Sequence, residues 1–134
     1  MNITCPYCQQ PAKYMASSEA VYHGRDYGPL WACLKCEAWV GCHPGTKKPL
    51  GRLANAELRK AKMAAHAAFD PIWKARYATK SPADPKYKKG MARGGRYKKL
   101  AELMGLTRDE CHIGEMNVEQ CLKVVELCQS GALE

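Results

Sequence analysis

Two pairs of cysteines near the start of the chain constrain its fold more than any other feature. Each pair has the spacing C-x-x-C, and the pairs are Cys5 with Cys8 and Cys33 with Cys36. A C-x-x-C turn presents two sulfur atoms side by side, and two such turns close a tetrahedral zinc site with Zn–S bonds of about 2.3 Å. The spacing therefore predicts one structural zinc ion held by four thiolates, and it disfavours a lone redox dithiol.

The residues around these cysteines predict a zinc ribbon, a small antiparallel sheet held by the metal. Short runs rich in aromatic and branched residues favour strands at 20–23, 30–32 and 37–41. The glycine and proline of segment 24–29 favour a turn between the first two. Because four thiolates fill a tetrahedral site, the zinc has no open position and is expected to be structural, not catalytic.

The other four cysteines are expected to lie outside this site. Cys42 and the adjacent His43 are interpreted as spare, with a ligand role as the alternative. Cys121 and Cys128 are seven residues apart on one expected helix face, which favours small apolar core residues. A second metal site that includes Cys111 and His112 is the less favoured interpretation. The first residues contain no secretory pattern, so we expect a reducing cytoplasm, where disulfides are rare.

Positive charge is concentrated in the middle of the chain. The formal net charge is +8, but residues 1–46 sum to zero, residues 47–99 carry +13 and residues 100–134 carry −5. Such a block is typical of proteins that bind a polyanion, because neutralised phosphates release condensed counterions. A solvated segment that only aids solubility, or a surface for an acidic protein, is the alternative.

The expected nucleic-acid contacts are basic residues of this block, next to aromatic residues able to stack on bases. They are Lys47, Lys48, Arg52, Arg59, Lys60, Lys88, Lys89, Arg93 and Arg96.

Apolar periodicity predicts a helix that begins at Leu53 or Asn55 and runs to about Phe69. Asp70 followed by Pro71 is typical of a helix start, so a separate short helix is expected at 72–77. The segment 79–95 combines glycine, proline and cations without apolar periodicity, which predicts a flexible connector.

The last part of the chain predicts a three-helix unit. Its first helix spans residues 96–104 and stops at Gly105. Thr107 and Glu110 form a capping pattern for a helix of one turn, and Asn117 opens the last helix. The expected apolar stripe of that last helix consists of Val118, Cys121, Leu122, Val125 and Cys128.

The expected fold is α+β, with a zinc ribbon followed by a long helix and an acidic helical unit. The expected segments are a ribbon at 1–46, a basic loop and bridging helix at 47–78, the connector at 79–95 and the helical unit at 96–134. We expect one compact body, because 134 residues suit a single domain. No apolar run reaches the roughly 20 residues that cross a bilayer.

Several runs of the chain resemble the small zinc-finger-containing domain proteins of bacteria, phages and prophages. The resemblance is carried by CPYC and WACLKC, by GCH-x-GT-x-x-PLG at 41–51 and by AH-x-x-FD-x-x-W at 65–73. It implies that Cys5, Cys8, Cys33 and Cys36 are the zinc ligands and that the chain is related to phage proteins. It implies no particular activity.

Three functions follow from these patterns. The first is nucleic-acid binding through the 47–99 block, with DNA and RNA both open. The second is an adaptor or inhibitor that docks on an acidic host or defence protein. The third is a metal-dependent nuclease using His43, His66, Asp70 or His112, but the sequence offers no carboxylate cluster for the metal. We therefore assign no catalytic residue, and the sequence favours a binding protein over an enzyme while leaving an enzymatic activity open.

Overall fold

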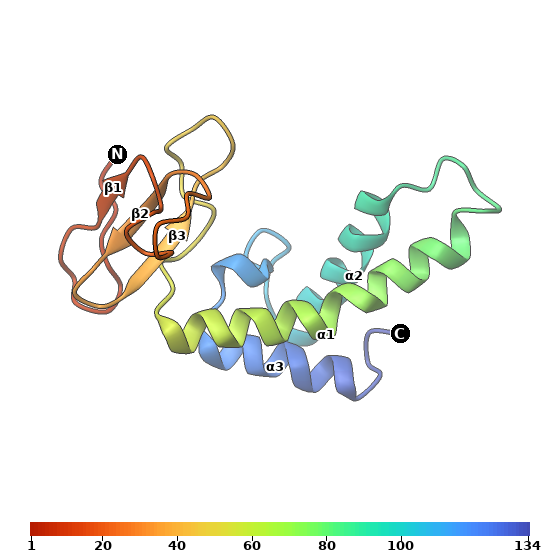
Figure 1. The fold of residues 1–134 in the computed structure, drawn as a ribbon. Coiled ribbons are helices and arrows are strands. Elements are labelled where there is room, and N and C mark those ends of the chain that lie inside the picture. Colours follow the sequence, from red (N-terminus) through yellow and green to blue (C-terminus); the bar gives the residue numbers. More distant parts are fainter. The chain divides into compact units, whose positions relative to one another are not determined.

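The computed structural model describes all residues, 1–134, and the chain divides into two compact units. The sheet unit comprises Met1–Arg59 and the helical unit comprises Lys60–Glu134. The α+β class is confirmed, since an antiparallel sheet with a four-cysteine cluster precedes the helices (Figure 1). That the expected segments form one compact body stays a prediction.

The sheet unit contains three short antiparallel strands in the order β1-β2-β3. They are β1 (Lys13–Met15), β2 (Leu30–Cys33) and β3 (Ala38–Gly41). All four residues of the central strand β2 are buried. Trp31 lies opposite Tyr14 on one side and Val40 on the other, and it forms part of the small core.

The strand expected at 20–23 is wrong, and its place in the sheet is taken by β1. The peptide N–H groups of Val21 and Tyr22 both donate to the carbonyl of Ser18, at 3.1 Å each, so the segment is a turn. The Asp26 carboxylate accepts from the peptide N–H groups of Ser18, at 3.2 Å, and Gly28, at 2.9 Å. These local side-chain bonds compete with strand pairing and hold the turn closed.

Helix α1 (Ala56–Lys80) begins where expected but continues eleven residues further than Phe69. The Asn55 side chain caps it, accepting from the peptide N–H of Leu58 at 2.9 Å. Asp70 does not start a second helix but lies within α1, where its carboxylate accepts from the indole N–H of Trp73 at 3.0 Å. Pro71 only removes one intrahelical hydrogen bond, and the helix passes through it.

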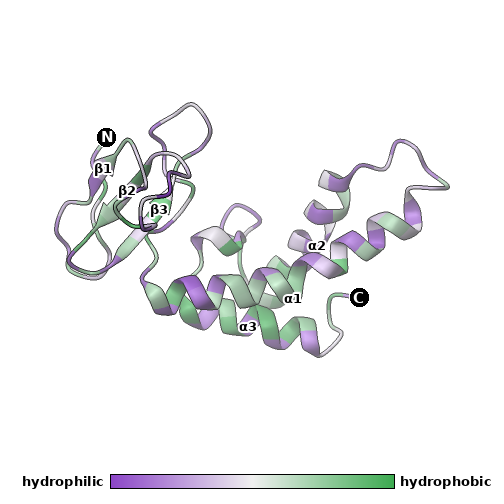
Figure 2. Ribbon diagram, viewed as in Figure 1, coloured by the Kyte–Doolittle hydropathy of each residue, from purple (hydrophilic) through white to green (hydrophobic).

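Helix α2 (Lys89–Met104) begins seven residues before the expected position of Arg96. The connector between α1 and α2 is therefore short, and Figure 2 shows it as hydrophilic. The helix forms despite three glycines because Ala92, Tyr97 and Leu100 are buried on one face. Gly105 ends it with a left-handed φ of 68°, as expected.

Helix α3 (Val118–Gln129) is capped by Asn117 and Gln120, which bond reciprocally as the sequence predicted. Its buried face is partly different from the expected stripe, since Val124 is fully buried whereas Leu122 is 58% exposed. Thr107 and Glu110 do form reciprocal bonds, but they close a turn and not a helix. A short 3-10 helix, η1 (Ile113–Glu115), follows that turn.

The helical unit is held by a core between α1, α2 and η1. The rings of Phe69 on α1 and Tyr97 on α2 are 4.4 Å apart between centroids. Leu100, Ile113 and Met116 are almost fully buried around them. None of the helices combines the length and the apolar character needed to cross a membrane.

The burial difference between two leucines gives a test of this core. Leu100 is 0% exposed, so Leu100→Ala should lower the free energy of unfolding by about 3 kcal/mol through reduced burial and an unfilled cavity. The same change at exposed Leu122 should cost about 0.5 kcal/mol or less. Urea unfolding followed by the helical circular dichroism signal measures both, and equal effects of the two changes would contradict this assignment of the core.

Candidate metal centre

The four predicted cysteines come together in the sheet unit. Cys5 and Cys8 lie in the turn before β1, Cys33 ends β2, and Cys36 lies in the turn between β2 and β3. Their sulfur atoms all lie within 4.8 Å of one another, and the Sγ atoms of Cys8 and Cys33 are 3.7 Å apart. Tetrahedral zinc with bonds of about 2.3 Å requires sulfur atoms about 3.8 Å apart, so the cluster has the size of a zinc site.

Both cysteine turns are followed by a residue with a left-handed backbone conformation. The residue after each pair, Gln9 or Glu37, adopts a left-handed conformation, with φ of 63° and 52° respectively. In the first turn the peptide N–H of Gln9 donates to the Cys5 carbonyl at 2.9 Å, and in the second Glu37 donates to Leu34 at 3.3 Å. Left-handed backbone is unfavourable for residues other than glycine, and metal binding would help to offset this conformational cost. Neither residue type signals such a conformation in the sequence.

Two side chains outside the ligand set brace these turns, and sequence analysis missed both roles. The Tyr7 hydroxyl, between the first two cysteines, donates to the Leu53 carbonyl at 3.3 Å and accepts from the Asn55 N–H at 3.2 Å. Arg59 donates to the carbonyl of Glu37 at 2.9 Å, next to Cys36, and its guanidinium lies 3.9 Å from the centroid of the Trp39 ring. Arg59, which was predicted to contact nucleic acid, is therefore engaged in contacts within the sheet unit.

The cluster is suited to a structural ion. Cys5 is fully buried and Cys33 is nearly so, while Cys8 and Cys36 are half-buried. Four thiolates leave a tetrahedral zinc ion no position for water or substrate. Burial, followed by hydrogen bonds with the neighbouring thiols, raises the pKa of Cys36 to about 12. A cation is therefore needed to displace the proton at neutral pH.

The remaining candidate ligands do not form a second centre. The four-cysteine cluster is the one group of three or more histidine, cysteine or acidic side chains with ligand atoms close enough to share a metal. Cys42 packs against the core of the sheet unit, and burial raises its pKa. Cys121 is fully buried, as expected for a core residue, whereas Cys128 is only half-buried. Cys111 is also fully buried.

The side chains considered for a nuclease have structural partners. His66 bonds through Nδ1 to the Lys62 carbonyl at 3.0 Å, and Asp70 bonds to Trp73. His112 contacts the Tyr97 ring at 5.7 Å between centroids. His43 is exposed in the loop after β3. His66 and Asp70, four residues apart on α1, therefore each bond to another group.

The basic residues predicted to contact nucleic acid differ in their surroundings. Arg96 donates to the Leu133 carbonyl at 2.7 Å, and burial lowers its pKa. Arg52 is exposed and engages other groups of the protein. The others apart from Arg59 are exposed: Lys47, Lys48, Lys60, Lys88, Lys89 and Arg93. Their contact with nucleic acid stays a prediction.

The cluster predicts a simple metal stoichiometry. The protein should contain one zinc ion per chain, and Cys33→Ser should abolish binding because the serine hydroxyl is a poor replacement for a thiolate. Elemental analysis of purified protein measures this. Cys42→Ser is the matched control and should retain one zinc ion, so loss of zinc from that variant would contradict the ligand assignment.

Zinc affinity should depend on pH. The metal binds thiolates and releases their protons, so the apparent dissociation constant should rise at least about tenfold for each unit that the pH falls below neutrality. Competition with a chromophoric chelator at several pH values measures this dependence. A dissociation constant that does not change with pH would exclude thiolate ligation.

Comparison with known families agrees with the geometry. A family model described as a zinc-finger-containing domain matches residues 1–131. None of the curated proteins and none of the solved structures matches the chain. Together, the family match and the four clustered sulfur atoms assign one zinc ion to this site. Over nearly its whole length, therefore, the chain belongs to the family of zinc-finger-containing domains.

Proposed function

We propose that this protein binds nucleic acid through phosphate contacts made mainly by the helical unit. The observation that carries the proposal is the concentration of cations between Lys60 and Lys99, where twelve basic residues face two acids. Nine of these cations are exposed and form no ion pair with a carboxylate: Lys60, Lys74, Lys80, Lys86, Lys88, Lys89, Arg93, Lys98 and Lys99. Unpaired, exposed cations are available to neutralise phosphates.

The two acids within this segment are occupied by the protein itself. Asp70 accepts from Trp73, and Asp84 accepts from the peptide N–H of Lys86 at 3.1 Å. None of the acidic residues after position 100 forms an ion pair with the cations from Lys74 to Lys99. The positive charge of the cations from Lys74 to Lys99 is therefore not cancelled by ion pairing.

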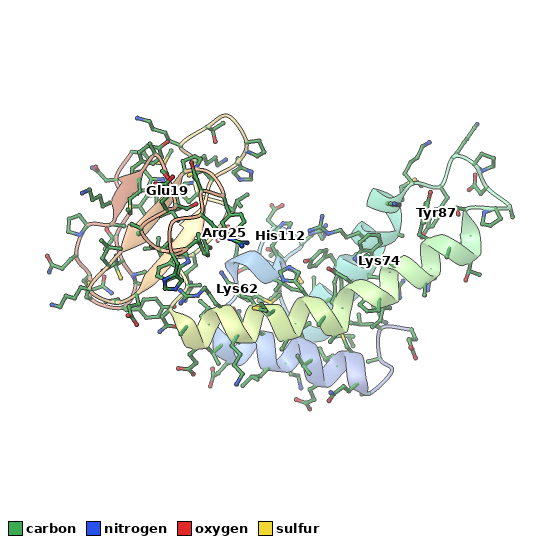
Figure 3. All side chains as sticks on the ribbon, in the orientation of Figure 1. Glu19, Arg25, Lys62, Lys74, Tyr87 and His112 are labelled. Carbon is green, nitrogen blue, oxygen red and sulfur yellow. The ribbon has the colours of Figure 1, made fainter.

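Aromatic rings lie among these cations where α1 ends and α2 begins. The rings of Tyr77 and Tyr87 stack with centroids 6.3 Å apart and an angle of 19° between their planes. Lys80 Nζ lies 5.4 Å from the Tyr87 ring, and Lys89 Nζ lies 5.7 Å from the Tyr77 ring. Figure 3 labels Tyr87 near this end of α1. Unpaired bases can stack on such rings while the neighbouring cations contact the phosphate backbone of the nucleic acid.

The sheet unit contributes less charge. Residues 1–59 carry seven basic and four acidic side chains, and a zinc ion with four thiolates adds a charge of −2. Lys47 and Lys48 are exposed in the loop after β3, and Lys47 Nζ lies 4.9 Å from the Tyr14 ring. We assign this loop a secondary role and the zinc ion a structural one.

Replacing four lysines around the tyrosine stack tests the proposal. Changing Lys80, Lys86, Lys88 and Lys89 to Gln together should weaken binding at least about tenfold at low salt. The slope of log affinity against log salt should fall by about 0.7–0.9 for each phosphate that the variant no longer neutralises. Fluorescence anisotropy with labelled single-stranded DNA, duplex DNA and RNA, using zinc-loaded protein, measures both quantities.

A charge-matched control separates local contacts from total charge. Changing Lys13, Arg25, Lys35 and Lys123 to Gln removes the same four charges from outside the block and should have the smaller effect. Equal weakening by the two variants would contradict a localised surface. Absence of binding by the unmodified protein at low salt would overturn the proposal and favour docking on an acidic protein.

A further inference from the structure

A small cavity in the helical unit is lined by cations and by two helical glycines. Its volume is about 180 Å³, and its lining residues are Gly90, Arg93, Gly94, Tyr97, Arg108 and His112. The first four belong to α2, and the last two belong to the segment between α2 and η1. His112, labelled in Figure 3, precedes η1 in the chain.

Two guanidinium groups and an imidazole surround the aromatic floor of this cavity. The Tyr97 ring is only 3% exposed, and the ζ carbons of Arg93 and Arg108 lie 5.6 and 5.1 Å from its centroid. Neither arginine forms an ion pair with a carboxylate. Arg108 donates to the Cys111 carbonyl at 3.4 Å, which uses one of its five N–H donors.

No carboxylate lines the cavity. Burial raises the pKa of Tyr97, and the charge of Asp70 contributes to the same shift. Asp70 accepts the indole N–H of Trp73. Two arginines that share one aromatic ring repel each other, and a bound anion relieves this repulsion.

The glycines of the cavity are not explained by the fold. Glycine disfavours helix formation, yet Gly90 and Gly94 lie four residues apart in α2 without a positive φ. A Cβ atom added at either position would meet no atom within 4 Å, so packing does not require glycine there. Their lack of side chains instead leaves space on the helix face that the cavity occupies.

We propose that this cavity binds a phosphate group of a nucleic acid. Arginine donates paired N–H groups that match phosphate oxygens, and here two arginines from separate segments flank one small cavity. His112 adds a further nitrogen donor, and the glycines allow a close approach to the α2 backbone. Gly90 lies in the first turn of α2, where peptide N–H groups lack intrahelical acceptors. This inference extends the proposed function by naming a subsite, and a small phosphate tests it separately.

The first experiment titrates full-length, zinc-loaded protein with inorganic phosphate under two-dimensional NMR. The expected result is a saturable shift of the amide signals of Gly90, Gly94 and His112. Gly94→Leu fills the cavity and should reduce the affinity for phosphate at least about tenfold. Gly95→Leu makes the same change at an exposed position of α2 outside the cavity and should leave the affinity unchanged.

The second experiment identifies the source of the phosphate. Short oligonucleotides with a 5′-phosphate or a 5′-hydroxyl are compared on the unmodified protein, on Arg93→Gln and on the control Arg25→Gln, which removes one exposed arginine from outside the cationic block. A preference for the 5′-phosphate that Arg93→Gln removes would support a terminal phosphate. Equal binding of both oligonucleotides, weakened by Arg93→Gln and Gly94→Leu but not by the controls, would support an internal phosphodiester.

Two outcomes would overturn the subsite. One is the absence of a phosphate-dependent shift at these amides, and the other is binding that Gly94→Leu and Gly95→Leu weaken equally. If oligonucleotides still bound with a steep salt dependence in either case, nucleic-acid binding would stand without this cavity. If oligonucleotides failed to bind while inorganic phosphate shifted the cavity amides, the proposed nucleic-acid ligand would be excluded.

Discussion

Ligation of zinc by four cysteines is the constraint on which the sheet unit depends. Strands of three or four residues are too short to form a stable sheet alone. The metal joins the turn before β1 to the end of β2 and the turn that leads into β3, so it ties all three strands. It also offsets the left-handed backbone at Gln9 and Glu37. Tyr7 then bonds the first ligand turn to Leu53 and Asn55, and Arg59 bonds to the second ligand turn, so both turns are connected to the last residues of the sheet unit.

The helical unit rests on a different interaction, the burial of Tyr97 against Phe69. Tyr97 is the one residue that serves both the core and the cationic cavity. One side of its ring packs in the unit, and Arg93, Arg108 and His112 lie around it. Because the core holds this ring in place, it gives Arg93 and Arg108 a fixed surface, which would lower the ordering cost of binding an anion.

Sequence patterns succeeded where the determining contacts are local. The spacing of the cysteines is enough to define the zinc ligands, and Asn117 with Gln120 caps α3 through bonds within one turn. The sequence predictions were wrong where contacts between residues far apart in the sequence determine the structure. Pro71 suggested the start of a new helix, but α1 continues through it, and Phe69 of α1 packs against Tyr97 of α2. The glycines of α2 looked like a linker, but burial of Ala92 and Tyr97 makes the segment helical. The cavity joins positions 93, 108 and 112, so no local pattern predicts it.

The two units differ strongly in net charge. With zinc bound, the sheet unit is nearly neutral, whereas the segment from Lys60 to Lys99 carries ten more positive than negative side chains. The acidic C-terminal segment would weaken this field if its carboxylates paired with the cations from Lys74 to Lys99, but it forms no ion pair with them, whereas Lys123 and Glu126 pair within α3. Glu110 bonds to Thr107, and that bond lowers the pKa of its carboxyl. Arg108, from the same acidic segment, instead reaches the cavity on the cationic side. The acidic segment therefore contributes a cation, Arg108, to the cavity. This arrangement is expected if both segments bind one anionic ligand.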